Sequence, residues 1–280
     1  MKKLLLIVPI VIVVIIVGVL LLNKDTPQKT IVNEKSYYIA MGDSVAAGVG
    51  LPTASDSSAC DRSDESYPNL IAKSNNFELL NIACSGASSS AGIVSGQEVN
   101  KLMLDPQTSS LTADKKPAII TLTVGANDIR WVNILQKCYT GICGDDVDKN
   151  TVSTGLEGLE SNLRNIFEKI QTTYPDDTPQ VYVSGYYRVF ISDISAGCSE
   201  RAGIDSDEMQ WIASVHNDLN ETIRKETVLR TFATFVKLDF TGHELCSPDP
   251  WIQGLAEKAP FHPNEHGQAE YSQSILKAIN

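Results

Sequence analysis

Positively charged side chains are scarce in this chain. The 280 residues include 23 Lys and Arg against 34 Asp and Glu, a formal net charge of −11. Lys2, Lys3 and Lys24 precede the first acidic residue, which leaves 20 basic against 34 acidic side chains and a net charge of −14 for the rest. Proteins that bind nucleic-acid phosphates use clustered Lys and Arg, and the sequence has no basic stripe. We therefore exclude nucleic acid as a partner.

Internal repeats and long low-complexity tracts are also absent from the sequence. Apolar residues make up 42% of it and charged residues 20%, with three Trp and nine Tyr. This composition is typical of a packed globule and excludes wholesale disorder. The length suffices for one large domain or two small ones.

One long hydrophobic run stands near the N-terminus. Residues Leu4–Leu22 carry no charge, and a helix of this length, at about 1.5 Å per residue, just crosses roughly 30 Å of hydrocarbon. No small-x-small cleavage site and no cysteine for lipid attachment lie near its end. We therefore predict an uncleaved signal anchor, a transmembrane helix, over residues 1–23 rather than a cleaved signal peptide. Lys2 and Lys3 precede the span, which predicts a cytosolic N-terminus and a domain outside the cytoplasm. The expected location is the cell membrane, or secretion if the segment is cleaved.

The motif CxxC, typical of many zinc sites, does not occur. Six cysteines follow the apolar run: Cys60, Cys84, Cys138, Cys143, Cys198 and Cys246. An exported domain folds in an oxidising compartment, where disulfides are the default; the alternative is six buried thiols in a cytosolic protein. The sequence pattern alone leaves the pairing open. We expect no metal.

Short apolar runs alternate with helical patterns after a polar tether at residues 24–36. The expected strands are 37–41, 79–83, 118–124, 180–183 and 234–240, several of them rich in β-branched or aromatic residues. Helical spacing of apolar residues appears over Leu156–Ile170 and Ile212–Ile223, and Gly267–Ile279 is expected to form a closing helix. This alternation predicts an α/β domain over residues 37–280, with a parallel sheet covered by helices on both faces. Ligands of such sheets bind at the carboxyl ends of the strands.

Chemically useful residues follow three of these strands. The first leads into Gly42-Asp43-Ser44, the second into Cys84-Ser85-Gly86 and the third into Gly125-Ala126-Asn127-Asp128; far downstream, Phe261-His262-Pro263-Asn264 precedes the last helix. Together they offer a nucleophile, donors for an oxyanion and a general base, which are the groups that acyl transfer needs. Each segment alone is a weak signal, since Gly-Asp-Ser also forms ordinary turns.

In this order the four segments resemble the SGNH, or GDSL-type, esterases and lipases, and are most similar to their secreted, disulfide-containing bacterial branch. The resemblance spans about residues 37–280. It implies a flavodoxin-like three-layer α/β/α sandwich with a five-stranded parallel sheet, and a serine esterase or lipase without a cofactor. The chain has no GxSxG elbow, so an ordinary α/β-hydrolase lacks its main support.

The resemblance also implies a role for each residue. Ser44 Oγ would attack the ester carbonyl, and His262 would take its proton and return it to the leaving alcohol. The backbone N–H groups of Ser44 and Gly86 and the side-chain amide of Asn127 would form the oxyanion hole. Many family members place an Asp three residues before the histidine, where this chain has Ala259. We expect a backbone carbonyl near Ala259 to accept the Nδ1 hydrogen, with Glu257 as the alternative carboxylate.

Three sequential disulfides are likewise implied by the resemblance: Cys60–Cys84, Cys138–Cys143 and Cys198–Cys246. The first would brace the loop that leads to Gly86.

The expected substrate is a small acyl ester, a lipid or an O-acylated glycan. An acidic surface does not favour anionic lipid headgroups. The membrane is the second expected partner, through the N-terminal helix, and we expect a monomer. The alternative function is a catalytically silent cell-surface module that binds glycans on the same fold.

Overall fold

The computed structural model describes residues 35–54, 59–190 and 203–280. The predicted signal anchor, residues 1–23, and nearly all of the tether, residues 24–36, lie outside these ranges. Within them, no helix has both the length and the apolar character needed to cross a bilayer.

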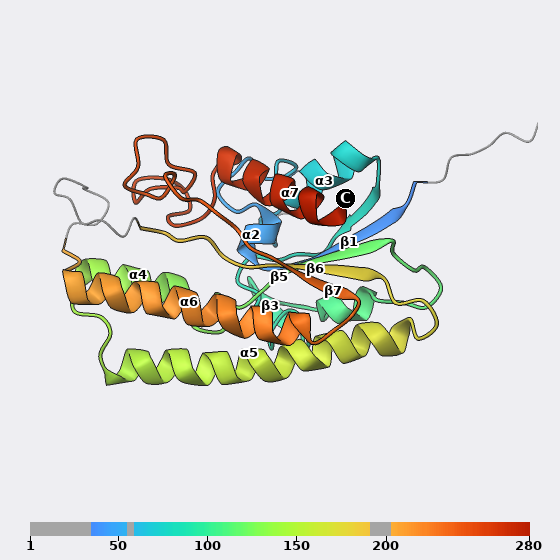
Figure 1. Ribbon diagram of the computed structural model, residues 1–280, viewed down its shortest axis with the longest axis horizontal. Helices are drawn as coiled ribbons and strands as arrows, with labels where there is room; N and C mark the ends of the chain where they lie inside the picture. The colour runs from blue at the N-terminus through green and yellow to red at the C-terminus, as the bar shows by residue number, and fades with distance from the viewer. Residues whose placement is uncertain (1–34, 55–58, 191–202) are drawn as a thin grey trace, which may run out of the picture. The chain divides into compact units, whose positions relative to one another are not determined.

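A five-stranded parallel sheet forms the centre of the domain (Figure 1). Its strands are β1 Tyr37–Gly42, β2 Glu78–Asn81, β5 Ile119–Thr123, β6 Gln180–Ser184 and β7 Ala233–Val236. They lie in the order β2-β1-β5-β6-β7, and every neighbouring pair is parallel. The predicted α/β class and the five-stranded parallel sheet are confirmed.

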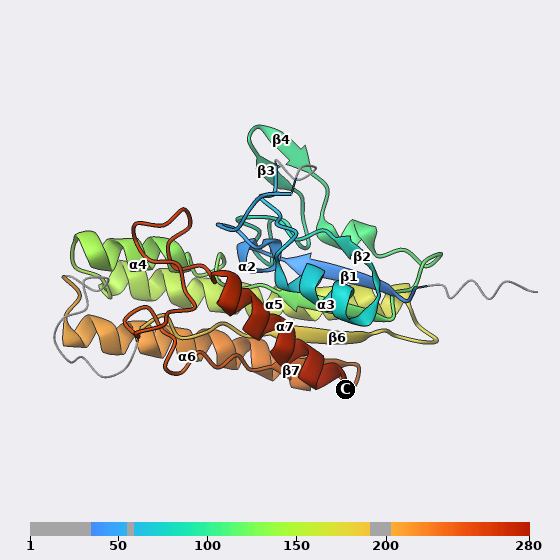
Figure 2. The same cartoon turned by 90° about the horizontal axis from the view of Figure 1, so that it is seen from above.

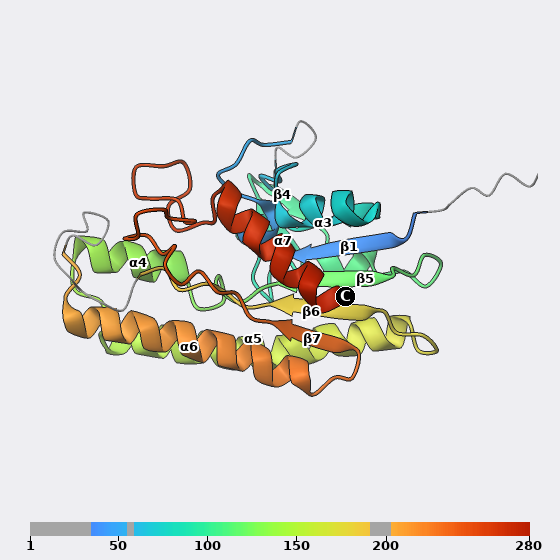
Figure 3. The same ribbon diagram turned by 45° about the horizontal axis from the view of Figure 1, so that its top comes forward.

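Helices cover both faces of this sheet. They are α2 Ser44–Ala47, α3 Tyr67–Asn75, α4 Trp131–Thr140, α5 Asp146–Thr173, α6 Ser206–Val228 and α7 Glu265–Ile279, with a 3₁₀ turn η1 at Gln107–Ser110. Helices α3 and α7 pack together on one face, and α5 and α6 on the other (Figures 1 and 3). Because both faces are covered, every residue of the central strand β5 is buried, as expected for parallel strands between two helical layers.

The chain reverses its direction of travel across the sheet between β1 and β5. It leaves β1 for β2 on one side and returns to place β5 on the other side, so that Gly42 and Thr123 are register partners at the ends of these neighbouring strands. At such a switch point the loops diverge at the carboxyl edge and leave room for a ligand. The loops that follow β1 and β5 are those in which the sequence predicts the serine and the asparagine.

Three parts of the fold differ from the predictions. The antiparallel hairpin of β3 Gln97–Val99 and β4 Leu102–Leu104 was not predicted, because three-residue strands give too little alternation to detect. Helix α4 was not predicted either. The strand predicted over residues 234–240 ends at Val236. The later residues keep the alternation of buried and exposed side chains, but β6 ends at Ser184 and offers them no further hydrogen-bonding partner.

Candidate active site

Ser44 stands at the tip of the turn that links β1 to α2. Gly42, the last residue of β1, has φ of +146°, and a Cβ there would lie 2.5 Å from the carbonyl oxygen of Thr123. Only glycine fits this turn. The Asp43 side chain then caps α2 by accepting a hydrogen bond of 2.9 Å from the Val45 N–H. Ser44 is therefore the first residue of the helix and is half-buried at the carboxyl edge of the sheet.

His262 reaches this serine from a loop 218 residues further along the chain. Its Nε2 lies 2.8 Å from Ser44 Oγ, which is hydrogen-bond distance. The loop enters α7, whose N-cap Asn264 accepts a hydrogen bond from the Gly267 N–H. The structure thus brings together the two residues for which the sequence predicts the roles of nucleophile and base.

The second imidazole nitrogen faces a backbone carbonyl. His262 Nδ1 lies 3.1 Å from the Pro260 oxygen, and the neighbouring Ala259 carbonyl accepts the backbone N–H of His262 at 3.2 Å. Phe261, which lies between Pro260 and His262, has φ of +69°. This left-handed turn brings the imidazole back over the Pro260 carbonyl. The carbonyl within hydrogen-bond distance of Nδ1 is that of Pro260, next to Ala259 in the chain. The alternative, Glu257, is exposed, and its carboxylate accepts a hydrogen bond from the Gly254 N–H instead.

The carbonyl partner fixes the tautomer of the imidazole. A carbonyl oxygen only accepts, so Nδ1 carries the hydrogen and the neutral ring presents an unprotonated Nε2 to Ser44. Burial lowers the pKa of His262, although hydrogen bonds to the Pro260 and Ala259 backbone oppose this effect. The lowered pKa favours the neutral ring, which presents an unprotonated Nε2 to Ser44.

Two further groups face the same edge of the sheet. Gly86 is exposed with φ of +77°, and Asn127 donates one amide hydrogen from Nδ2 to the Ala87 carbonyl at 2.8 Å. That bond orients the asparagine and leaves its second amide hydrogen available. Among the residues that the structure describes, no acceptor is found for the backbone N–H of Ser44 or Gly86. Such unsatisfied donors suit an oxyanion that appears only during reaction.

A partly buried contact ties the loop of Gly86 to the loop of Asn127. The Asp128 carboxylate accepts hydrogen bonds from the backbone N–H of Ser89 at 2.9 Å and from the Ser89 hydroxyl. Asn162 of α5 donates to the same hydroxyl at 3.0 Å. Burial raises the pKa of Asp128, and the bonds from Ser89 oppose the rise. Asp128 thus holds two loops together rather than taking part in proton transfer.

Asp43, the residue before the serine, has a fully buried carboxylate. Tyr186 donates its hydroxyl to Asp43 Oδ2 at 2.5 Å, and the same hydroxyl accepts the Ala126 N–H at 3.1 Å. Complete burial raises the pKa of Asp43 to about 7, against the hydrogen bonds from Tyr186 and Val45. This network connects the serine turn to the residue before Asn127.

Buried glutamines support the backbone of the two segments that carry Ser44 and His262, and sequence reasoning missed them. The Gln107 amide accepts the Gly42 N–H and donates to the Gly42 carbonyl, both at 2.8 Å. Gln268 donates to the Val45 carbonyl at 2.9 Å. Gln253 accepts the Ala259 N–H and donates to the Pro263 carbonyl. No sequence signal identifies them, because a glutamine amide fits any backbone group that it meets.

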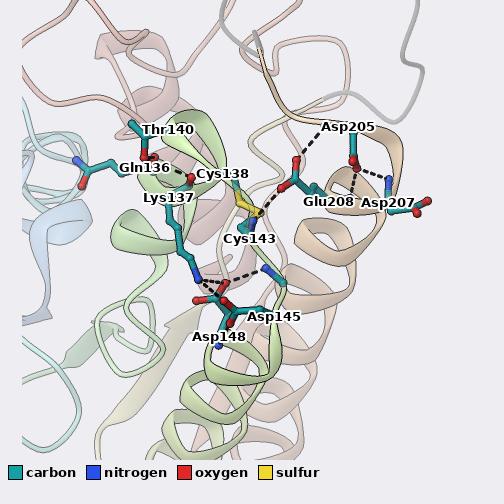
Figure 4. The surroundings of a disulfide bond; sticks show 11 residues. Gln136, Lys137, Cys138, Thr140, Cys143, Asp145, Asp148, Asp205, Asp207 and Glu208 are labelled. Carbon is teal, nitrogen blue, oxygen red and sulfur yellow. Dashed lines mark hydrogen bonds and ion pairs between the residues drawn. A yellow bond between two sulfur atoms is a disulfide. The ribbon is translucent and has the colours of Figure 1, made fainter.

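Two of the three predicted disulfides are found. Cys60–Cys84 braces the chain just before Gly86, and Cys138–Cys143 joins the last turns of α4 to the segment that precedes α5. Figure 4 shows the second bridge next to the Glu208 carboxylate, which accepts the Cys143 N–H at 2.8 Å. The third predicted pair includes Cys198, which lies outside the described residues.

The fold and this site define an ester hydrolase. A hydroxyl bonded to a neutral imidazole stands beside preorganised donors at the switch point of a parallel sheet.

The comparisons with known proteins identify the family. The model of the GDSL-like lipase/acylhydrolase family matches residues 40–270, and the chain belongs to this family. It is 29% identical over 252 residues to a lipase from Streptomyces rimosus, covering 87% of this chain and 85% of the relative. It is 26% identical over 261 residues to Lipase 1 from Streptomyces coelicolor, covering 90% of each.

Solved structures are similar over most of the chain. An extracellular lipase from Streptomyces rimosus superposes with a TM-score of 0.70 at 26% identity, covering 87% of this chain and 99% of the other. A phospholipase A1 from Streptomyces albidoflavus gives a TM-score of 0.69 at 26% identity with the same coverage. The predicted family and the predicted class, a hydrolase that acts on ester bonds, are confirmed.

Proposed function

We propose that this protein is a serine esterase or lipase that hydrolyses carboxylic esters through an acyl-enzyme formed on Ser44. The observation that carries this proposal is the pair of hydrogen bonds that connect the Ser44 hydroxyl to the His262 imidazole and the imidazole to the Pro260 carbonyl. Its geometry provides a base of the correct tautomer at hydrogen-bond distance from a half-buried nucleophile.

The reaction has two steps, acylation of Ser44 and hydrolysis of the acyl-enzyme. Ser44 Oγ forms a bond to the ester carbonyl carbon while its proton passes to His262 Nε2, and the tetrahedral intermediate then expels the alcohol, whose oxygen takes that proton. Water repeats the sequence on the acyl-enzyme. It loses a proton to Nε2 as it attacks, and Ser44 leaves with that proton as the carboxylic acid is released. No cofactor enters either step.

The Pro260 carbonyl takes the place of a triad carboxylate. In each step the imidazole becomes positively charged for part of the reaction, and the Nδ1–H remains bonded to the carbonyl dipole throughout. A dipole stabilises this cation less than a full negative charge does, but it fixes ring orientation and tautomer equally well. The protein thus works as a Ser-His dyad.

The oxyanion of each tetrahedral intermediate accepts hydrogen bonds from three donors: the Ser44 N–H, the Gly86 N–H and the Asn127 amide. Each gains strength only as charge develops on the carbonyl oxygen, so that the donors favour the transition state over the bound ester. An uncharged amide at Asn127 suits this role, because a carboxylate there would repel the oxyanion.

The substrate is proposed to be a neutral acyl ester, such as a simple lipid or an O-acylated glycan. Relatives named lipase and phospholipase A1 support an acyl ester of lipid type. The net charge of −14 beyond the N-terminal segment opposes close approach to anionic headgroups.

Location at the membrane is part of the proposal. The uncharged run Leu4–Leu22, preceded by Lys2 and Lys3, supports an anchor with the hydrolase domain outside the cytoplasm. Membranes extracted with alkaline carbonate should retain the protein. Its release into the supernatant would contradict an anchor.

The test of the activity is hydrolysis of p-nitrophenyl esters from acetate to palmitate. Ser44→Ala should reduce kcat at least about a thousandfold, whereas Ser214→Ala, the same change at an exposed position of α6, should not. Activity that survives in Ser44→Ala would refute the nucleophile. A disulfide-intact wild type that hydrolyses no ester and does not react with a serine-directed phosphonate would favour the silent binding module.

A further inference from the structure

The loop that carries Gly86 is held by contacts on nearly every peptide. The Ser85 N–H donates to the Cys60 carbonyl at 3.1 Å, and the Ala87 N–H donates to the Cys84 carbonyl at 3.1 Å. The Ala87 carbonyl accepts the Asn127 amide. The peptide between Ser85 and Gly86 lacks any such backbone partner within the described part of the chain.

One side chain holds this peptide instead. Gln97, the first residue of the β3–β4 hairpin, is buried, and its Nε2 donates to the Ser85 carbonyl at 2.8 Å. A Cβ on Gly86 would lie 3.4 Å from the same Nε2, so the Gln97 amide lies directly against the glycine. Figure 2 shows the hairpin at the top of the view, above α2.

The direction of the Ser85 carbonyl decides the direction of the Gly86 N–H. The two belong to one planar trans peptide and point in opposite directions. A carbonyl that is fixed toward Gln97 therefore sends the N–H to the far side, away from the hairpin. Without the Gln97 donor this peptide could rotate easily, because Gly86 accepts positive and negative φ almost equally well.

We propose that Gln97 is a positioning residue that aims the Gly86 N–H at the oxyanion by holding the Ser85 carbonyl. The proposal rests on the serine esterase mechanism above. Within the described part of the chain, Gln97 forms no hydrogen bond with Ser44 or His262, so it acts through the peptide that it holds.

The oxygen of the Gln97 amide gives evidence against a role in packing alone. Gln97 Oε1 is buried and has no hydrogen-bond partner. An unsatisfied buried acceptor costs stability, and an apolar side chain of the same length would avoid that cost. The hydrogen bond that Gln97 Nε2 donates to the Ser85 carbonyl explains why an amide stands at this position.

Gln97→Met removes the donor and keeps the length of the side chain. The full-length protein in detergent should hydrolyse p-nitrophenyl butyrate with kcat about 10- to 100-fold lower and KM within about twofold. The loss is smaller than the 10²–10³ typical of deleting a donor, because the free peptide still adopts the productive orientation part of the time. The inhibition constant of butylboronic acid, which forms a tetrahedral adduct on a catalytic serine, should rise by a similar factor.

Gln273→Met, the same change at an exposed position of α7, is the matched control and should leave kcat, KM and boronate inhibition unchanged. An unchanged kcat in Gln97→Met, or an effect confined to KM, overturns the proposal. If wild type hydrolyses esters and Ser44→Ala does not, such a result refutes the role of Gln97 alone. If wild type is inactive, it is the proposed function that fails.

Gln97→Glu gives a readout that lost packing would not produce. At neutral pH its carboxylate cannot donate to the Ser85 carbonyl, but on acidification the protonated carboxyl group can. The ratio of kcat to that of wild type should therefore rise as the pH falls, while the ratio for Gln97→Met stays constant. A constant ratio for both variants overturns the proposal.

A measurement on the unaltered protein covers the case in which neither variant folds. The side-chain amide hydrogens of Gln97 should exchange slowly in NMR spectra, and the Gly86 amide proton should shift downfield when butylboronic acid binds. Fast exchange at Gln97 or an unmoved Gly86 resonance counts against the proposal.

Discussion

Asp43 is expected to make the stability of this protein depend on pH. Burial raises the pKa of its carboxyl group from the ordinary value of 3.8 to about 7. The native state therefore binds more protons than the unfolded state between these two values, and the free energy of unfolding falls as the pH rises through this window. A tenfold change in proton affinity is worth about 1.4 kcal/mol, so the contribution of Asp43 should fall by roughly 4 kcal/mol from acid to neutral pH.

Asp43→Asn removes this titration and keeps an oxygen that can accept the Val45 N–H. We expect the unfolding free energy of the variant, relative to wild type, to be constant below about pH 4 and to rise by several kcal/mol toward pH 7. Urea unfolding of both disulfide-intact proteins at a series of pH values measures this difference.

The comparison between the two proteins cancels the contributions of other groups. His216, for example, has a pKa lowered by burial, so its own contribution to stability increases with pH and acts in the opposite direction. A relative stability that stays flat from acid to neutral pH, or that falls, would refute the reasoning about Asp43.

Three other predictions concern the catalytic groups. Asn127→Ala should lower kcat about 10²–10³-fold with little change in KM, because the amide acts on charge that appears in the transition state; steady-state kinetics that show an effect on KM alone would contradict this. Burial lowers the pKa of His262 below its ordinary 6.5, so kcat/KM should rise with pH through a midpoint below that value and then level off. A midpoint above 6.5 would mean that the imidazole is not desolvated as described. Glu257→Gln should leave the hydrolysis rate unchanged, since its carboxylate is exposed and bonded to Gly254; a loss of about a hundredfold would make Glu257 the third member of a triad.

The fold could be predicted largely from local patterns. The β-branched run of β5 and the helical spacing of Leu159, Leu163 and Ile170 in α5 each reflect burial by a neighbouring layer. Such burial leaves a periodic record in the sequence. The β3–β4 hairpin left no comparable record. Its strands are too short for a period, and its turn at Asn100 and Lys101 has positive φ at both residues without the Asn-Gly pair that usually marks such turns.

The candidate site also has parts that the sequence predicts and parts that it does not. Ser44, Gly86, Asn127 and His262 lie in four segments whose residue types and order are typical of the family. The partner of His262 Nδ1 had no such marker. Every residue has a carbonyl, and the left-handed turn at Phe261 selects that of Pro260 over that of Ala259.

The sequence by itself determined the parallel α/β class, the family and the four residues at the carboxyl edge of the sheet, because each depends on side-chain chemistry at particular positions. The two disulfides that are found were implied by the resemblance to the family, since the sequence pattern alone left the pairing open. Only the tertiary structure decided how those residues are held. The buried glutamines in the described ranges are Gln97, Gln107, Gln253 and Gln268. Each one bonds the backbone within a few residues of a proposed catalytic group. A glutamine amide can donate to or accept from any peptide, so its role depends on which peptide the folded chain places within about 3 Å of it.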